Sequence, residues 1–178
     1  MPTSIGGSVR FEIPTLATER VALRGFRADD AAAYAKLNAD PAFRRYLGDG
    51  RVLSANESWL QMERALGQWA LRGYGLFVVE YQGRLAGRVG VLHPADWPEP
   101  ELAWGIAPDL WGRGLAAEAT AAARDWAFRA CGFPLLASFI LPGNARSARV
   151  AAKLGASRVG QIEILGLKAE RWVHPAPA

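Results

Sequence analysis

The sequence predicts a single α/β domain whose mixed central sheet carries helices on both faces. At 178 residues the chain is long enough for one domain with a sizeable core and short for two. Hydrophobic residues make up 51% and charged residues 21%, a balance typical of globular proteins. Segments with a strand period and segments with a helix period alternate, in the order strand, helices, three strands, helix, strand, helix and two strands.

The first quarter of the chain carries one predicted strand and two predicted helices. Residues 1–17 show no clear period and are expected to form a tail or an edge segment. Alternating apolar and polar residues predict a strand over 20–26. A helix is predicted over 28–40, where an acidic pair in the first turn suits the helix dipole, and a short one over 43–47.

A longer amphipathic helix is predicted next. Ser54, followed three residues later by Glu57, matches the capping-box pattern, and Gly73 marks the end of the helix. The residues expected on its buried side are Trp59, Met62, Leu66 and Trp69.

The middle of the chain contains the clearest hairpin. Two apolar, β-branched runs at 75–81 and 84–92 flank Gln82-Gly83, a two-residue turn with glycine second. A proline-rich loop over 93–100 then leads into a strand over 101–106.

Two helices and three strands are predicted for the last third. A helix is expected over 116–130 and a strand over 135–140, followed by a helix over 144–154 and a pair of strands within 158–173. The buried side of the first helix is expected to hold Ala119, Ala123, Trp126 and Ala127.

The charge pattern argues against a nucleic-acid-binding protein. The chain has 21 basic and 17 acidic residues and a formal net charge of +4, but the basic residues form no run or stripe. Such a distribution suits a small anionic ligand at least as well as nucleic acid. We therefore expect no nucleic-acid partner.

Targeting signals and metal-ligand clusters are also missing from the sequence. Residues 1–10 lack the apolar core of a secretion signal, and no apolar run reaches membrane-spanning length, so a cytoplasmic protein without membrane contact is expected. Cys131 is the only cysteine, which excludes an internal disulfide and a multi-cysteine metal site. With only two histidines, His93 and His174, no metal is expected.

A strand, a glycine turn and a helix follow one another over 102–119. The free N–H groups at such a helix start attract phosphates. Gly112-Arg-Gly-Leu-Ala-Ala117 matches the dinucleotide fingerprint G-x-G-x-x-A, but the strand over 135–140 offers no Asp or Glu to hold a ribose. The phosphate-loop sequence Gly-Lys-Ser/Thr is absent as well. A nicotinamide dinucleotide is therefore disfavoured.

The same turn resembles a known family. As Trp111-x-x-Gly114-x-Ala116 it is similar to the coenzyme-A pyrophosphate loop of the GCN5-related N-acetyltransferases (GNAT), with the signature Gln/Arg-x-x-Gly-x-Gly/Ala. Residues 107–119 resemble the A-P-x-x-W-G-x-G-x-A-x-E-A segment of the branch that acetylates ribosomal-protein N-termini (RimJ/RimL-type), and residues 142–155 resemble the family's P-x-N-x-x-S-x-x-x-x-x-K-L-G-F motif. Trp111, where Gln or Arg is usual, and Ala156, where an aromatic residue is usual, depart from the pattern.

The resemblance covers roughly residues 18–174 and implies a GNAT fold, with a mostly antiparallel sheet and a splayed strand pair. It implies an acetyl-CoA-dependent enzyme that acetylates a primary amine, on a protein N-terminus or a small molecule, by direct transfer in a ternary complex without metal. The oligomeric state is left open between monomer and homodimer. The alternative is a non-catalytic acyl-CoA-binding or sensing domain on the same fold.

Backbone groups are expected to hold most of the coenzyme. The glycines let the chain approach the diphosphate, with Arg113 as an added cation, while by resemblance the splayed strand ending at Ile106 pairs with the pantetheine arm and polarises the thioester. Asn144 would bind a pantetheine amide, cap its own helix, or both. The candidate coenzyme-binding residues are Ile106, Trp111, Gly112, Arg113, Gly114, Leu115, Ala116 and Asn144.

Two residues are candidates for proton transfer. Glu101 stands where the branch often carries an acidic residue facing the acceptor, and it could take the ammonium proton if burial raises its pKa. His93, Asp96 and Glu99 in the preceding loop are rivals for this role. Many family members protonate the thiolate with a tyrosine at the position that is Ala151 here, which leaves Ser147, unless that serine only caps its helix.

Overall fold

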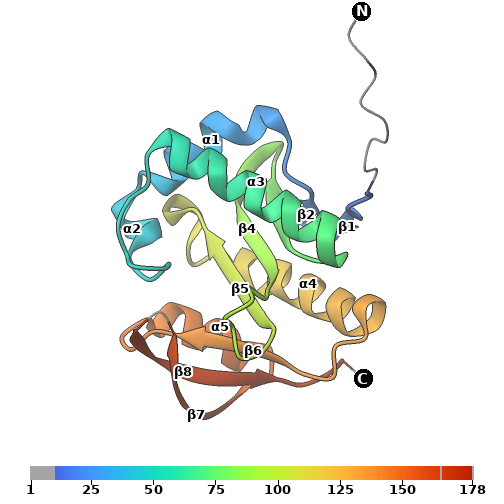
Figure 1. Cartoon of the computed structure of the whole chain (residues 1–178), viewed down its shortest axis with the longest axis vertical. Helices are drawn as coiled ribbons and strands as arrows, with labels where there is room; N and C mark the ends of the chain where they lie inside the picture. Colours follow the sequence, from blue (N-terminus) through green and yellow to red (C-terminus); the bar gives the residue numbers. More distant parts are fainter. Residues whose placement is uncertain (1–10, 165, 178) are drawn as a thin grey trace, which may run out of the picture.

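An eight-stranded sheet runs through the molecule in the order β1-β2-β3-β4-β5-β6-β8-β7 (Figure 1). This computed structural model describes residues 11–164 and 166–177. The strands are β1 Leu16–Ala17, β2 Val21–Arg24, β3 Leu76–Tyr81, β4 Arg84–Leu92, β5 Glu101–Ile106, β6 Leu136–Ile140, β7 Ser157–Ile164 and β8 Leu167–His174. The helices are α1 Ala31–Asn38, α2 Pro41–Arg44, α3 Ala55–Arg72, α4 Leu115–Cys131 and α5 Ala145–Lys153, with short 3-10 turns at Ala28–Asp30 and Pro108–Leu110.

The sheet divides between β5 and β6. Every other neighbouring pair of the described strands is antiparallel, whereas β5 and β6 are parallel and meet only where Glu101 lies opposite Ala137. Beyond that point the two strands diverge, so the later part of β5 has a free edge. The predicted fold class, including the splayed strand pair, is therefore confirmed.

Helices cover the larger half of the sheet. α1 and α3 pack on each other, and α1 also packs against β4, while α4 lies against β2, β4 and β5 (Figure 1). In the core, Phe77 of β3 makes edge-to-face contacts with Trp69 of α3 and Trp126 of α4, with ring centroids 4.8 and 5.4 Å apart. None of the described helices is long and apolar enough to cross a membrane.

Local sequence signals define several of these elements. Ser54 and Glu57 form the predicted capping box at the start of α3, and Gly73 ends that helix in a left-handed conformation. Gln82 and Gly83 both have positive φ, 52° and 73°, as the two-residue hairpin turn requires. Both predictions are confirmed.

Two details differ from the sequence prediction. The short second helix spans Pro41–Arg44 rather than 43–47, because the Asp40 side chain caps it by accepting from the Ala42 N–H at 2.7 Å. Trp59 is 41% exposed, and Ser58 takes the buried position beside Met62 on α3. Leu16 and Ala17 form an edge strand on β2, in agreement with the edge segment predicted within 1–17, of which residues 1–10 lie outside the described residues.

Candidate active site

A cavity of about 360 Å³ lies at the C-terminal end of β5, between the start of α4 and α5. We call it the first cavity. All the candidate coenzyme-binding residues except Arg113 line it, and so does Ser147. Two segments that are 27 positions apart in the sequence, at 106–117 and 144–153, are thereby brought together at one site.

The turn into α4 exposes backbone donors to this cavity. Gly112 and Gly114 have φ of 78° and 80°, in the left-handed region that side-chain-bearing residues avoid. α4 begins directly after Gly114, and no side chain caps its first turn. Its first N–H groups therefore remain available to an anion, at the positive end of the helix dipole.

Trp111 connects this turn to the strand and to α5. Its indole Nε1 donates to the Ile106 carbonyl at 2.7 Å, and the Arg146 guanidinium stacks 3.6 Å from its ring centroid. A cation thus lies beside the position that is usually Gln or Arg in the signature. The departure at Trp111 is compensated by a residue from α5.

Basic residues of α5 add positive charge to the first cavity. Arg146, Arg149 and Lys153 line it at helical spacing, although sequence reasoning did not select them. Their spacing of three and four residues was the available signal, but it is common on exposed helix faces.

Arg113 does not line the first cavity, and its side chain is exposed. Its carbonyl accepts from Arg20 Nη1 at 2.8 Å, and Arg20 Nη2 lies 2.6 Å from Glu118 Oε2 on α4. Thr18 Oγ1 also donates to Glu118, at 2.6 Å. The segment before β2 therefore braces the glycine turn from outside the cavity.

The free edge of β5 faces the gap between β5 and β6. The Ala107 N–H donates to the Ala86 carbonyl at 2.8 Å, so the adjacent pair, Ile106 with Gly87, is a non-hydrogen-bonded one. The backbone groups of Ile106 and Trp104 consequently point away from β4. The edge can accept an extended amide-bearing chain as an additional strand.

Asn144 and Ser147 lie together at the start of α5. Asn144 Oδ1 accepts from the Ser147 N–H at 3.3 Å, which makes Asn144 the helix cap. Both residues also line the first cavity, so capping does not remove either one from the site.

Glu101 lines a second cavity, of about 380 Å³, between α3, β4, β5 and the adjoining ends of β7 and β8. Trp97 Nε1 donates to Glu101 Oε2 at 2.8 Å. Burial raises the pKa of Glu101 to about 7, against the opposing effects of the Trp97 hydrogen bond and the Arg88 charge. Tyr46, Leu47 and Trp104 line both cavities, which therefore share a wall.

The rival residues for the proton-accepting role lie less favourably. Glu99 is paired with Arg171, whose Nη2 lies 2.6 Å from Glu99 Oε2. His93 faces Tyr74, with Nδ1 3.2 Å from the phenol oxygen, and neither His93 nor Glu99 lines the second cavity. Asp96 does line it, but from an exposed position in the loop.

The splayed sheet, the uncapped glycine turn and the motif on α5 define an acyl-CoA-dependent transferase. A family model for the acetyltransferase (GNAT) domain matches residues 20–157, and the chain belongs to this family. It is an acetyl-CoA-dependent N-acetyltransferase, as its sequence resemblance implies.

Individual relatives agree with this assignment. An acetyltransferase from Agrobacterium tumefaciens str. C58 is 31% identical, with a TM-score of 0.82 over 96% of this chain and 99% of that one. The uncharacterized protein YkkB of Bacillus subtilis (strain 168) is 30% identical over 147 residues, which is 79% of this chain and 83% of YkkB. RimL, a ribosomal L7/L12 alpha-N-protein acetyltransferase solved in complex with coenzyme A, shares the fold at 16% identity, with a TM-score of 0.77 over 93% and 98%.

Proposed function

We propose that the protein transfers the acetyl group of acetyl-CoA directly to a primary amine, with both substrates bound at once. The observation that carries this proposal is the shared wall between the two cavities. The first cavity presents backbone donors and basic side chains for the coenzyme, and the second presents Glu101 for the acceptor. Because the two cavities adjoin, both substrates are held close together, and the acetyl group passes between them without an intermediate carrier.

Different residues bind the coenzyme, orient its thioester and protonate the thiolate. The uncapped turn at Gly112 and Gly114 binds the diphosphate, and the free edge of β5 orients the pantetheine arm. The Ile106 N–H, on that edge, is placed to donate to the thioester oxygen and stabilise developing negative charge. Ser147 is the candidate donor of the proton that the departing thiolate takes up, a modest requirement because thiols have pKa values near 8.5.

Glu101 accepts the proton that the acceptor ammonium must lose. The neutral amine then forms the N–C bond as the C–S bond breaks. The nitrogen loses its second proton in this step and the sulfur gains one, so the products are a neutral amide and a free thiol. Because burial raises the pKa of Glu101 to about 7, the carboxylate is a stronger base than an exposed glutamate and is ionised in about half of the molecules at neutral pH.

Direct transfer is also supported by the position of the only thiol. Cys131 lies at the C-terminal end of α4, lines neither cavity, and burial raises the pKa of its thiol. An acetyl-cysteine intermediate would need an accessible thiolate near the first cavity.

Two-substrate kinetics test this proposal. Thiol release from acetyl-CoA is measured against a panel of small amines and N-terminal peptides, with the acetylated product identified by mass. We expect intersecting reciprocal plots, no acetylated protein with acetyl-CoA alone, and full activity in Cys131→Ala. Parallel plots with an acetylated protein would contradict direct transfer, and coenzyme binding without thiol release for any amine would favour the non-catalytic alternative.

A further inference from the structure

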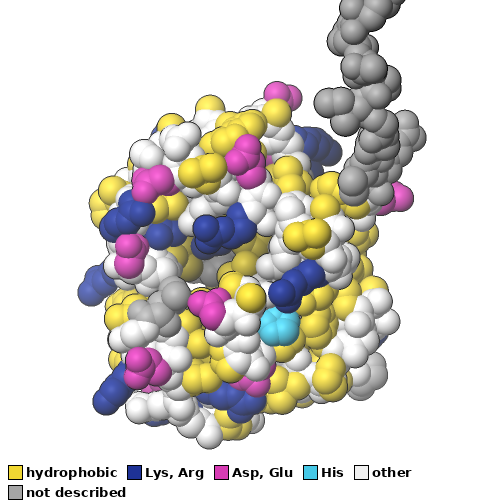
Figure 2. All heavy atoms as spheres, viewed as in Figure 1, with side chains coloured by type: hydrophobic (Ala, Val, Ile, Leu, Met, Phe, Trp, Pro, Cys, Tyr) yellow, Lys and Arg dark blue, Asp and Glu magenta, His cyan; other side chains and the backbone are white. Residues whose placement is uncertain are grey.

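The second cavity carries more basic than acidic side chains. Its charged lining consists of three basic residues, Arg44, Arg64 and Arg88, and two acidic residues, Asp96 and Glu101. Figure 2 shows a hollow in this face of the molecule, with dark blue basic side chains above it and a magenta acidic one below. For a pocket that must bind an ammonium-bearing substrate, this excess of positive charge is unexpected.

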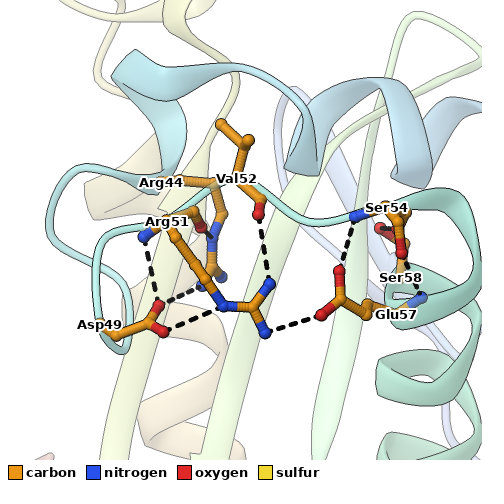
Figure 3. Close-up of polar contacts among 7 residues, drawn as sticks. All are labelled: Arg44, Asp49, Arg51, Val52, Ser54, Glu57 and Ser58. Atoms are coloured by element: carbon orange, nitrogen blue, oxygen red, sulfur yellow. Dashed lines mark hydrogen bonds and ion pairs between the residues drawn. The ribbon is translucent and has the colours of Figure 1, made fainter.

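Arg44 is a buried cation whose ion pair within the described residues is a long one to an exposed carboxylate. Only 3% of the residue is exposed, and its Nε donates to the Arg51 carbonyl at 2.9 Å. Its nearest carboxylate is that of Asp49, where Nη2 and Oδ1 are 3.9 Å apart, too far for a hydrogen bond (Figure 3). Within residues 11–164 and 166–177, no partner accepts from Nη1 or Nη2 of Arg44 within hydrogen-bond distance.

Asp49 is already engaged by another arginine. Its side chain is 63% exposed and accepts from Arg51 Nε at 3.1 Å, and Arg51 Nη2 lies 2.7 Å from Glu57 Oε1 (Figure 3). Both surface carboxylates, Asp49 and Glu57, therefore pair closely with Arg51, and Arg44 lies behind them with only its long contact to Asp49. Burial, and then the Arg88 charge, lower the pKa of Arg44, and the Asp49 charge offsets this effect only in part.

Arg88 is a second cation without a partner. Among the described side chains it makes no hydrogen bond or ion pair. On the sheet, Arg88 lies opposite Gly105 and Leu92 lies opposite Glu101, so Arg88 and Glu101 project from the same face. They are four positions apart along the strands, about 13 Å at the Cα atoms, and Ala103 leaves open space between them.

We propose that the acceptor is a small primary amine that also carries an oxyanion, a carboxylate or a phosphate, and that Arg44 and Arg88 bind this group while the amine faces Glu101. The inference rests on the proposed transfer function and names the substrate class of the same site. The bound oxyanion supplies a close counter-charge to Arg88, which pairs with none of the described side chains, and to Arg44, whose ion pair with Asp49 is 3.9 Å long. The cavity of about 380 Å³ fits a small molecule.

The positive charge also assists the chemistry at the amine. Guanidinium groups near the acceptor disfavour its ammonium form, so the proton passes to Glu101 more readily. At the end of the substrate away from the amine, the oxyanion offsets the positive charges of Arg44 and Arg88. An amine without an oxyanion would leave Arg88 without a paired anion and Arg44 with only its long ion pair to Asp49.

Matched pairs of acceptors test this proposal. Thiol release is measured for α-amino acids against their carboxamides, for O-phosphoethanolamine against ethanolamine, and for peptides with acidic first residues against neutral ones. We expect kcat/KM for the anionic member of the amino-acid or phosphate pair to exceed that of its neutral partner by at least about tenfold. The pair with the larger ratio identifies carboxylate or phosphate as the bound group.

Variants assign the preference to the arginines. Arg88→Met should reduce the ratio to below about threefold and leave the KM for acetyl-CoA unchanged, whereas Arg88→Lys should retain part of it. The matched control is Arg129→Met, which removes one exposed positive charge outside both cavities. Arg44 is left intact because its Nε holds the loop at Arg51.

A binding measurement separates this inference from the proposed function. N-acetyl amino acids and their amides are titrated into the coenzyme-A-loaded protein by calorimetry. Tighter binding of the acids, lost in Arg88→Met, supports the oxyanion site even if no amine is acetylated, in which case only the transfer proposal fails. Equal rates and equal binding within each pair, a preference that survives in Arg88→Met, or a preference confined to peptides would overturn the inference.

Discussion

The two cavities are built in different ways. The first presents the backbone of a glycine turn, an uncapped helix start and a free strand edge, beside side chains from α5 and from residues 42–47. The second is formed by side chains from α2, α3, β4, β5 and the loop before β5. A backbone site suits a ligand common to a whole family, whereas a side-chain site can change one substitution at a time. Variants should therefore affect the two substrates separately.

The largest expected effect of a single change falls on the first cavity. Gly114→Glu adds a Cβ at a φ of 80° and a negative charge at the diphosphate position, so both geometry and electrostatics oppose binding. We expect the Kd of acetyl-CoA, measured by calorimetry, to rise by at least about 100-fold. Retained binding of an N-acetyl amino acid would show that the variant is folded and that its second cavity is intact. An unchanged acetyl-CoA Kd would contradict the assignment of the turn.

The pH dependence of the second cavity is the next test. Glu101 must be ionised to accept a proton, and its pKa, raised by burial to about 7, lies above the usual value of 4.5. At saturating acetyl-CoA, kcat/KM for the amine should fall about tenfold per pH unit below 7. This fall in kcat/KM below pH 7 should be absent in Glu101→Gln, and the Kd of acetyl-CoA should not change over the same pH range. A wild-type profile that is flat from pH 5 to 7 would exclude Glu101 as the base.

A smaller effect is expected at Trp111. Arg146→Met removes the guanidinium stacked 3.6 Å from the indole centroid and should weaken acetyl-CoA binding about fivefold, with kcat little changed. The matched control is again Arg129→Met, which should leave the Kd unchanged. If both variants weaken binding equally, the effect is one of net charge and not of the stacked cation.

The smallest effect is expected outside both cavities. Arg20→Met breaks the link between the Arg113 carbonyl and Glu118 but leaves every residue lining the cavities in place. Because Arg20 is exposed, we expect a loss of about 0.5–1 kcal/mol in the free energy of unfolding. Because the turn loosens, the Kd of acetyl-CoA should rise by up to about two- to fivefold, the factor that 0.5–1 kcal/mol corresponds to. A thermal melt and calorimetry measure the two quantities, and a Kd unchanged within error would show that the brace has no effect on the turn.

The first cavity could be predicted from the sequence more fully than the second. The hairpin at Gln82-Gly83, the cap at Ser54 and the glycine turn are encoded by neighbouring residues, so short-range rules identify them. The coenzyme residues follow because two such segments carry recognisable motifs. The family and the fold class are accordingly predictable from the sequence.

The second cavity depends on contacts that no local pattern records. Arg44 is in the wall because Asp40 moves the start of α2, and Arg88 shares a face with Glu101 only through the register of β4 and β5. The exposure of Trp59 has a similar origin, since the packing of α3 on α1 turns Ser58 inward instead. These placements follow from tertiary packing, which periodicity alone does not specify.

The most direct test of the account compares two measurements on Glu101→Gln. The account predicts that the Kd of acetyl-CoA stays within twofold of wild type while kcat for the preferred amine falls by at least about 100-fold. The two cavities would then be shown to serve separate substrates, with the proton accepted in the second. A kcat equal to that of wild type, or a loss of acetyl-CoA binding that accounts for the lost activity, would contradict the account.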